Sequence, residues 1–145
     1  MGNRNLNLFC ILLIISFMPS NADGIPKGYV LKILSGNTFL YKDLVREIDY
    51  GGTNLIFKLN CTETFPKKSN LEKSAKKYLE TLILQKRLFG NIVRYGRGKE
   101  VLVKIIAGRD SEGEFKDKYV FLSTRMIRKG LLKKSKITEN CQFGD

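Results

Sequence analysis

A single segment with helical periodicity, flanked by stretches that alternate with a period of two, constrains this chain most. Between Ser69 and Ile83, apolar residues recur at the spacing of one helix face, with charged residues opposite. The apolar positions are Leu71, Ala75, Tyr78, Leu79, Leu82 and Ile83, and the charged positions are Lys73, Lys76, Lys77 and Glu80. Ser69 and Asn70 are residue types that cap helix N-termini. The sequence therefore predicts one amphipathic helix in mid-chain.

Strand patterns lie on both sides of this helix. Residues rich in β-branched and aromatic types, separated by Gly- and Asn-containing turns, predict strands over 28–34, 38–41, 54–59, 99–107 and 119–122. A short second helix is predicted over 124–132. Residues 99–107 and 119–122 are predicted to pair as a second hairpin. Three strands, a helix, two strands and a helix predict an α+β fold, a five-stranded OB-type β-barrel with an inserted helix and a C-terminal helix.

The N-terminal residues resemble a secretory signal. A start with Arg4 precedes an apolar run from Leu8 to Met18, and Ser20-Asn21-Ala22 supplies small residues for cleavage after Ala22. The run has 11 residues, and as a helix it would span roughly 16 Å, about half a bilayer core. We expect a signal peptide over 1–22, a domain over 23–132 and a polar basic tail over 133–145. The mature chain would be secreted or periplasmic, without an integral membrane span.

The charge balance indicates the kind of partner. The chain has 26 Lys and Arg against 14 Asp and Glu, a formal charge of +12, and removal of Arg4 with the signal would leave 25 − 14 = +11. Nucleic acid, an anionic polymer and an anionic membrane all fit this charge. The chain has no His, which excludes an imidazole base, nucleophile or metal ligand. We expect a monomer that binds polyanions.

Two cysteines remain after the signal, Cys61 and Cys141. An even count in an exported chain is compatible with a disulfide between them. Two buried thiols are the alternative, and the sequence leaves both open.

Several strings, in this order along the chain, are similar to the thermonuclease, or staphylococcal-nuclease-like, family. They run from Gly28 to Thr38, from Phe57 to Thr64, through the helix at Ser74-Ala75, Tyr78-Leu79 and Leu82-Ile83, over Tyr95-Gly96-Arg97, and from Met126 to Leu132. The resemblance implies an OB-fold phosphodiesterase that uses calcium to hydrolyse DNA or RNA. In that chemistry, two Asp bind the ion, a Glu activates water and two Arg hold the phosphate.

The resemblance carries over to this chain with substitutions. The metal-binding Asp positions fall on Asn37 and Glu63, and the first phosphate-binding Arg falls on Lys58. The catalytic Glu falls on Pro66, which has no acid. Loss of such a base typically costs about 10²- to 10⁴-fold in rate. The catalytic set is therefore degraded by this comparison, and whether the protein is an enzyme stays open.

The second Arg position has two possible registers. If Tyr95-Gly96-Arg97 is the family motif, Arg97 is retained, but the two strands predicted after it are one too many. In the other register, Glu114 replaces the Arg and residues 86–98 form an extra segment. The second register fits the predicted number of strands better.

A basic segment with an interleaved aromatic residue suggests a nucleic-acid surface, formed by Lys86, Arg87, Arg94 and Tyr95. A solvated basic loop is the alternative. Three functional hypotheses follow: a calcium-dependent nuclease, a non-catalytic basic OB module that binds nucleic acid or another polyanion, and an exported protein-interaction domain.

Overall fold

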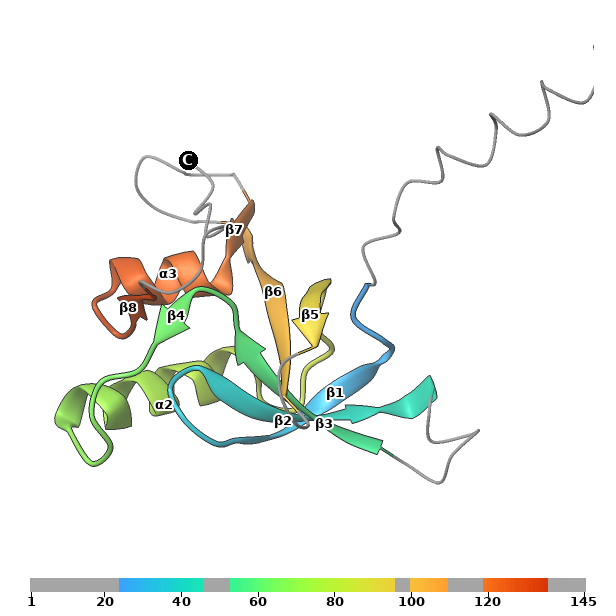
Figure 1. Ribbon diagram of the computed structural model, residues 1–145, viewed down its shortest axis with the longest axis horizontal. Coiled ribbons are helices and arrows are strands. Elements are labelled where there is room, and N and C mark those ends of the chain that lie inside the picture. Colours follow the sequence, from blue (N-terminus) through green and yellow to red (C-terminus); the bar gives the residue numbers. More distant parts are fainter. Residues whose placement is uncertain (1–23, 46–52, 96–99, 110–118, 136–145) are drawn as a thin grey trace, which may run out of the picture.

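The computed structural model describes residues 24–45, 53–95, 100–109 and 119–135. Figure 1 shows an α+β fold in which two helices lie beside a mixed sheet. The elements follow in the order β1 (Gly28–Ile33), β2 (Thr38–Asp43), β3 (Thr53–Leu59), β4 (Thr62–Glu63), α2 (Asn70–Ile83), β5 (Gly90–Tyr95), β6 (Glu100–Arg109), β7 (Tyr119–Phe121), α3 (Leu122–Arg128) and β8 (Lys133–Lys134). The predicted signal peptide lies outside the described residues. None of the helices within these ranges is long and apolar enough to cross a bilayer.

The main sheet has the strand order β1-β2-β3-β6-β5, and β7 pairs with β6. The first three strands form the predicted antiparallel meander. β6 joins β3 in parallel and pairs with β5 and β7 in antiparallel fashion. The predicted alternation of β6 is confirmed, because Val101, Val103 and Ile105 are buried.

β5 corrects one prediction, because residues 86–98 were expected to contain no strand. The strand runs over Gly90–Tyr95 and is largely exposed. A register shift between Ile92 and Arg94 interrupts its pairing with β6. A mostly exposed strand with an irregularity lacks the period-two apolar pattern that marks a strand in sequence.

The two edges of the sheet approach each other around the core. The Val30 N–H of β1 donates to the Lys86 carbonyl oxygen over 3.3 Å, and the Gln85 N–H donates back to the Val30 carbonyl oxygen over 2.9 Å. Gly24 and Asn91 form a further isolated bridge. The chain that leads into β5 is therefore bonded to β1 by single pairs rather than by a continuous ladder.

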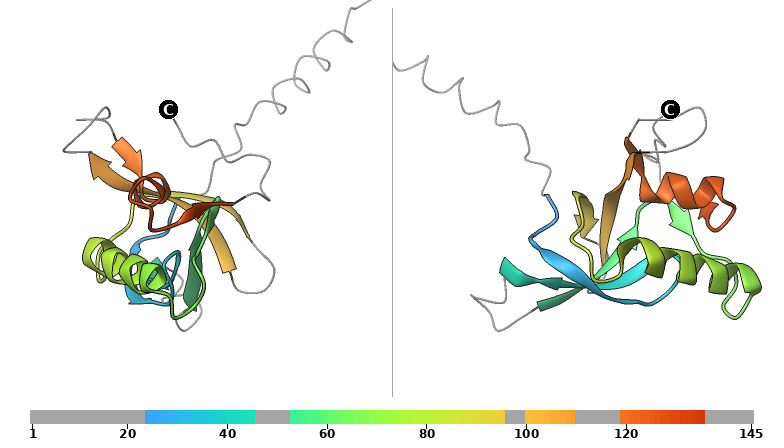
Figure 2. Two further views of the ribbon diagram at one scale, coloured as in Figure 1. Left: turned by 90° about the vertical axis from the view of Figure 1, so that its left-hand side faces the viewer. Right: turned by 180° about the vertical axis from the view of Figure 1, so that it is seen from behind.

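The helices lie on the same side of the molecule in Figure 2. The predicted cap of α2 is confirmed, because the Ser69 side chain accepts the Glu72 N–H. α3 begins at Leu122, two residues before its predicted start, and the chain adopts a positive φ of 70° at Gly130 shortly after its end. Both helices contribute to one core with the sheet, which includes Leu79 and Met126.

A two-stranded ladder joins the C-terminal residues to the chain after β3. Thr62 and Glu63 of β4 pair with Lys134 and Lys133 of β8. The sequence assigned the two lysines to a polar tail, but a pair of charged residues gives no strand pattern of its own. Lys133 and Lys134 are therefore part of a two-stranded ladder.

Candidate functional site

The turn between β1 and β2 is held by the buried side chain of Asn37. Its Oδ1 accepts hydrogen bonds from the hydroxyls of Ser35 (3.1 Å) and Thr38 (2.9 Å). Its Nδ2 lies 3.2 Å from the Thr62 hydroxyl and 3.3 Å from the Thr62 carbonyl oxygen, and donates to them. Only 4% of Asn37 is exposed. The amide oxygen thus holds the turn itself, while the amide nitrogen ties the turn to β4.

Glu72 of α2 secures the same turn from the other side, and the sequence analysis did not single it out. Its Oε1 accepts the Gly36 N–H over 2.9 Å, while its Oε2 is buried without a hydrogen-bond partner in the described structure. The turn packs closely against α2 at Gly36, because a Cβ added to Gly36 would lie 2.8 Å from the Ala75 Cβ. The Ser69-to-Glu72 spacing resembles a capping box, which was the available signal, but Glu72 bonds the distant turn instead.

Glu63 is half-buried on β4, next to the residue that Asn37 contacts. Its Oε1 accepts a hydrogen bond of 3.4 Å from the Ser135 hydroxyl, and Lys133 is its strand partner. The structure therefore brings the two predicted metal ligands, Asn37 and Glu63, to one end of the molecule.

This donor set does not suit calcium. The ion takes six to eight oxygen ligands, among which carboxylates dominate in tight sites. Here the Asn37 oxygen already accepts two hydroxyl donors, and Glu63 accepts the Ser135 hydroxyl and faces Lys133. Within the described ranges, no three His, Cys, Asp or Glu gather as a metal-binding group.

A second arrangement lies on the outer face of the sheet. The residues Thr38, Lys58, Leu102 and Arg94, which we call the cross-strand row, are register partners across β2, β3, β6 and β5. The strand neighbours of Thr38, Lys58 and Leu102 include the buried residues Phe39, Phe57, Val101 and Val103, so these three side chains point away from the core. Arg94 follows the register shift in β5, pairs with Leu102 and is exposed. Because adjacent strands are about 4.8 Å apart, the Lys58 and Arg94 backbones lie about 10 Å apart.

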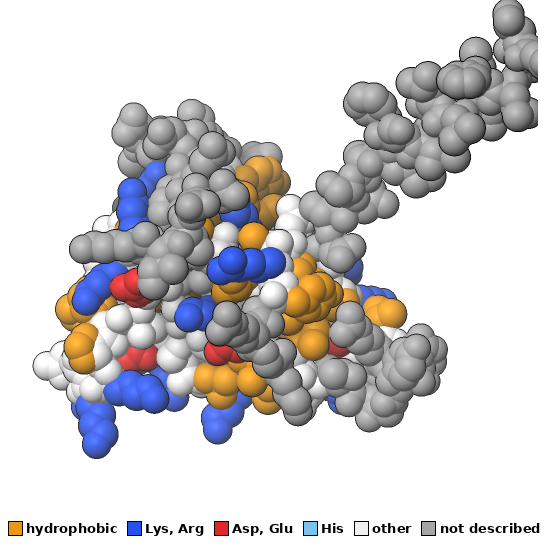
Figure 3. Space-filling view, viewed as in Figure 1, with side chains coloured by type: hydrophobic (Ala, Val, Ile, Leu, Met, Phe, Trp, Pro, Cys, Tyr) orange, Lys and Arg blue, Asp and Glu red, His pale blue; other side chains and the backbone are white. Residues whose placement is uncertain are grey.

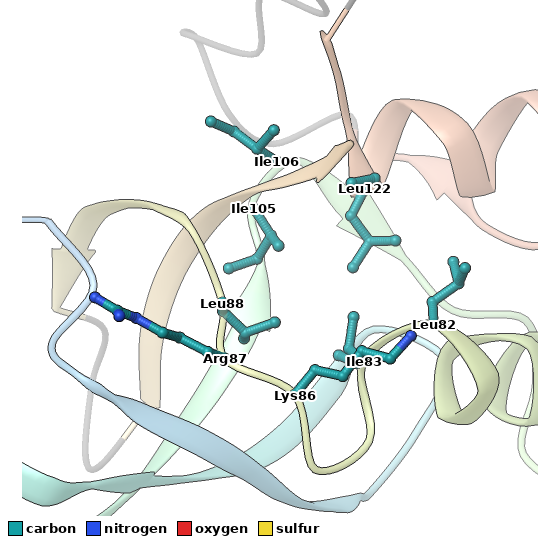
Figure 4. Close-up of a pocket in the computed structure, with 9 residues that line it drawn as sticks. Leu82, Ile83, Lys86, Arg87, Leu88, Ile105, Ile106 and Leu122 are labelled. Atoms are coloured by element: carbon teal, nitrogen blue, oxygen red, sulfur yellow. The ribbon is translucent and has the colours of Figure 1, made fainter. Parts of the chain in front are cut away.

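The predicted basic segment divides into two places. Arg94 and Tyr95 lie at the end of β5, where Tyr95 is 55% exposed. Lys86 and Arg87 lie in the connection before β5, at the opposite end of the strand. Figure 4 shows the Lys86 and Arg87 side chains directed to opposite sides of this connection. The four residues thus form two basic positions and not one patch.

A pocket of about 250 Å³ opens beside this connection (Figure 4). It is bounded by the end of α2, by β6 and by Leu122 of α3, and its charged lining residues are Lys86 and Arg87. Among the described residues that line it, none carries an acid, a hydroxyl or a thiol. Among the described lining residues, the amine of the exposed Lys86 is therefore the one group of a type used in acid-base or nucleophilic chemistry.

Tyr41 of β2 is fully buried and belongs to the core. Its hydroxyl donates to the Pro26 carbonyl oxygen over 2.7 Å, and its ring stacks on Phe57 with centroids 4.7 Å apart. Burial raises the pKa of Tyr41 to about 12, nearby Asp43 adds to the rise, and Arg87 opposes it. The phenol is therefore neutral at ordinary pH.

Lys and Arg outnumber Asp and Glu among the residues that the structure describes. Among the acids that the structure describes, Asp43 and Glu72 are buried, which leaves Glu63, Glu80 and Glu100. Figure 3 shows Lys and Arg spread over one face with few acidic side chains between them, and an apolar area near the position of β5. Such a surface attracts polyanions.

Three predicted positions fall outside the described residues, namely Arg97, Glu114 and Cys141. With β5 ending at Tyr95 and β6 beginning at Glu100, however, the number of strands no longer favours the register that places Glu114 at the second Arg position. Cys61 is disulfide-bonded. Its pairing with Cys141 stays a prediction.

Comparison with protein-family models and with curated proteins found no match for this chain.

Proposed function

We propose that this protein is an exported, basic OB-type module, related to the thermonuclease-like family, that binds nucleic acid without hydrolysing it. The strand order β1-β2-β3-β6-β5, with backbone bonds that lead from the β5 side back to β1, supports the OB-type topology. A predicted signal peptide supports export.

The cross-strand row is the observation that carries the binding proposal. It places Lys58 and Arg94 on one outward-facing line, with Leu102 between them. Cations at this spacing can contact successive anionic groups of a polymer and release its counterions. Many OB folds bind single-stranded nucleic acid along a positively charged groove of their sheet.

The turn at Ser35–Asn37 supports the lack of hydrolysis. The Asn37 amide is used in holding Thr62, and Pro66 stands where the resemblance implies a base. Lys58 can attract a phosphate, but it lacks the planar fork with which Arg holds two phosphate oxygens. Among the described residues at this end of the molecule, the carboxylates are Glu63 and Glu72, and each already accepts a hydrogen bond from the protein, whereas calcium takes six to eight oxygen ligands.

Binding and cleavage can be tested together with a fluorescent single-stranded DNA in calcium and in chelator. We expect fluorescence anisotropy to show binding, and the logarithm of the association constant to fall linearly with the logarithm of salt concentration between about 50 and 200 mM. We expect no cleavage in either buffer. Calcium-dependent cleavage that Glu63→Ala abolishes would establish a nuclease instead. Absence of binding at low salt would favour the protein-interaction domain.

A further inference from the structure

Three apolar side chains line up across the outer face at the far end of β6. Ile106 is the strand partner of Phe121, and its N–H donates to the Phe89 carbonyl oxygen over 2.8 Å. Phe89 is 60% exposed and Ile106 is 40% exposed. Figure 4 shows the Ile106 side chain pointing away from Ile105, which is buried. We call Phe89, Ile106 and Phe121 the aromatic row.

A cationic side chain lies over each of the two aromatic rings of this row. The Arg87 guanidinium carbon lies 5.2 Å from the centroid of the Phe89 ring, and the Lys104 Nζ lies 5.7 Å from that of Phe121. Two other cation-ring pairs involve Tyr78 and Phe65, but both of those rings are half-buried. Phe89 therefore combines a neighbouring positive charge with a largely exposed ring.

The aromatic row continues the cross-strand row along β6. Leu102, Lys104 and Ile106 are alternate residues of that strand, and alternate residues point to the same face. Leu102 belongs to the cross-strand row and Ile106 to the aromatic row, so the two rows are four residues, or about 13 Å, apart. Cationic and aromatic groups thus follow one another along a single strand.

We propose that the aromatic row is the base-contacting part of a single-stranded nucleic-acid site, a proposal that rests on the proposed function. The bases stack against Phe89 beside Ile106, while Lys104, Lys58 and Arg94 meet the phosphates. Exposed rings interleaved with cations match a ligand that offers both flat bases and phosphates. A sulfated polysaccharide offers the negative charge but no flat base.

The test compares a short oligo-dT with an abasic oligonucleotide of equal length and therefore equal charge. Anisotropy is measured for the wild-type chain, for Phe89→Ala, for Phe89→Trp and for Leu71→Ala, the last removing a 45% exposed apolar side chain of α2 as a matched control. We expect the wild type and Leu71→Ala to prefer oligo-dT by about tenfold. Phe89→Ala should lose that preference with unchanged abasic binding, and Phe89→Trp should retain it.

Each other outcome separates the two proposals. Equal binding of both oligonucleotides by the wild type, or a preference that survives in Phe89→Ala, overturns the base-contacting role and leaves polyanion binding intact. Binding to neither oligonucleotide at low salt overturns the proposed function together with this inference. Tight binding to anionic phospholipid vesicles that Phe89→Ala weakens, without a preference for oligo-dT, would assign the row to a membrane surface.

Discussion

The turn at Ser35–Asn37 and the outer face of β6 use polar residues in opposite ways. At the turn, Asn37 and Glu72 are buried and bond to Thr62 and to the Gly36 backbone. On the outer face, Lys58, Lys104 and Arg94 are half-buried or exposed. Buried polar groups that hydrogen-bond within the protein stabilise the fold, whereas outward-pointing cations can bind a ligand. Asn37, a metal-ligand position by the resemblance, thus holds the turn in place, and we propose that the neighbouring face binds the ligand.

Asn37→Asp should have the largest effect, because it restores the residue type that the family resemblance implies. A carboxylate at this place would set an acceptor against the Thr62 carbonyl oxygen and bury a charge, which we expect to cost about 3 kcal/mol of unfolding free energy. Urea denaturation with and without calcium measures this cost. If Asn37→Asp instead has the unfolding free energy of the wild type and calcium raises that free energy, the turn is a metal site. The contrast between the turn and the outer face of β6 would then be wrong.

Lys58→Ala combined with Arg94→Ala should weaken oligonucleotide binding roughly 10- to 100-fold and lower the salt slope by about two. Both side chains lie outside the core, so stability should change little. Lys73→Ala with Lys77→Ala removes the same charge from the exposed face of α2 and serves as the matched control. Equal losses in the two double variants would mean that overall charge, and not the cross-strand row, attracts the ligand.

Ser69→Ala sharpens the structural side of the comparison. The Ser69 hydroxyl accepts the Glu72 N–H over 3.2 Å at the start of α2. Its removal should cost about 1 kcal/mol of unfolding free energy and leave oligonucleotide affinity at wild-type level. Denaturation and anisotropy on the same sample test this, and a parallel loss of affinity would link the turn to binding.

Tyr41 should make the stability of the protein depend on pH only in alkali. Its pKa is raised in the folded protein to about 12 from an ordinary value of 10, so the stabilisation is fully present below pH 10 and is lost as the pH rises towards 12. Denaturation midpoints measured across this range should fall for the wild type and fall less for Tyr41→Phe. The same decline in both would show that another group titrates.

Local patterns in the sequence predict the helices and the meander but not the contacts between distant segments. α2 and its Ser69 cap lie in one continuous stretch with helical periodicity, so both could be predicted. The Glu72 bond to Gly36 joins residues 36 positions apart, and no local spacing reports it. Lys58 and Arg94 come together only because β6 pairs in parallel with β3 and in antiparallel fashion with β5. β5 was missed for a different reason, because a largely exposed strand with a register shift lacks the alternating apolar pattern.

The most direct test is an NMR titration of the ¹⁵N-labelled protein with oligo-dT, in calcium and again in chelator. We predict that the amide signals of Lys58, Leu102 and Arg94 shift in both buffers, while those of Gly36, Asn37 and Thr62 stay in place. Shifts that centre on Gly36, Asn37 and Thr62 and that require calcium would contradict the account.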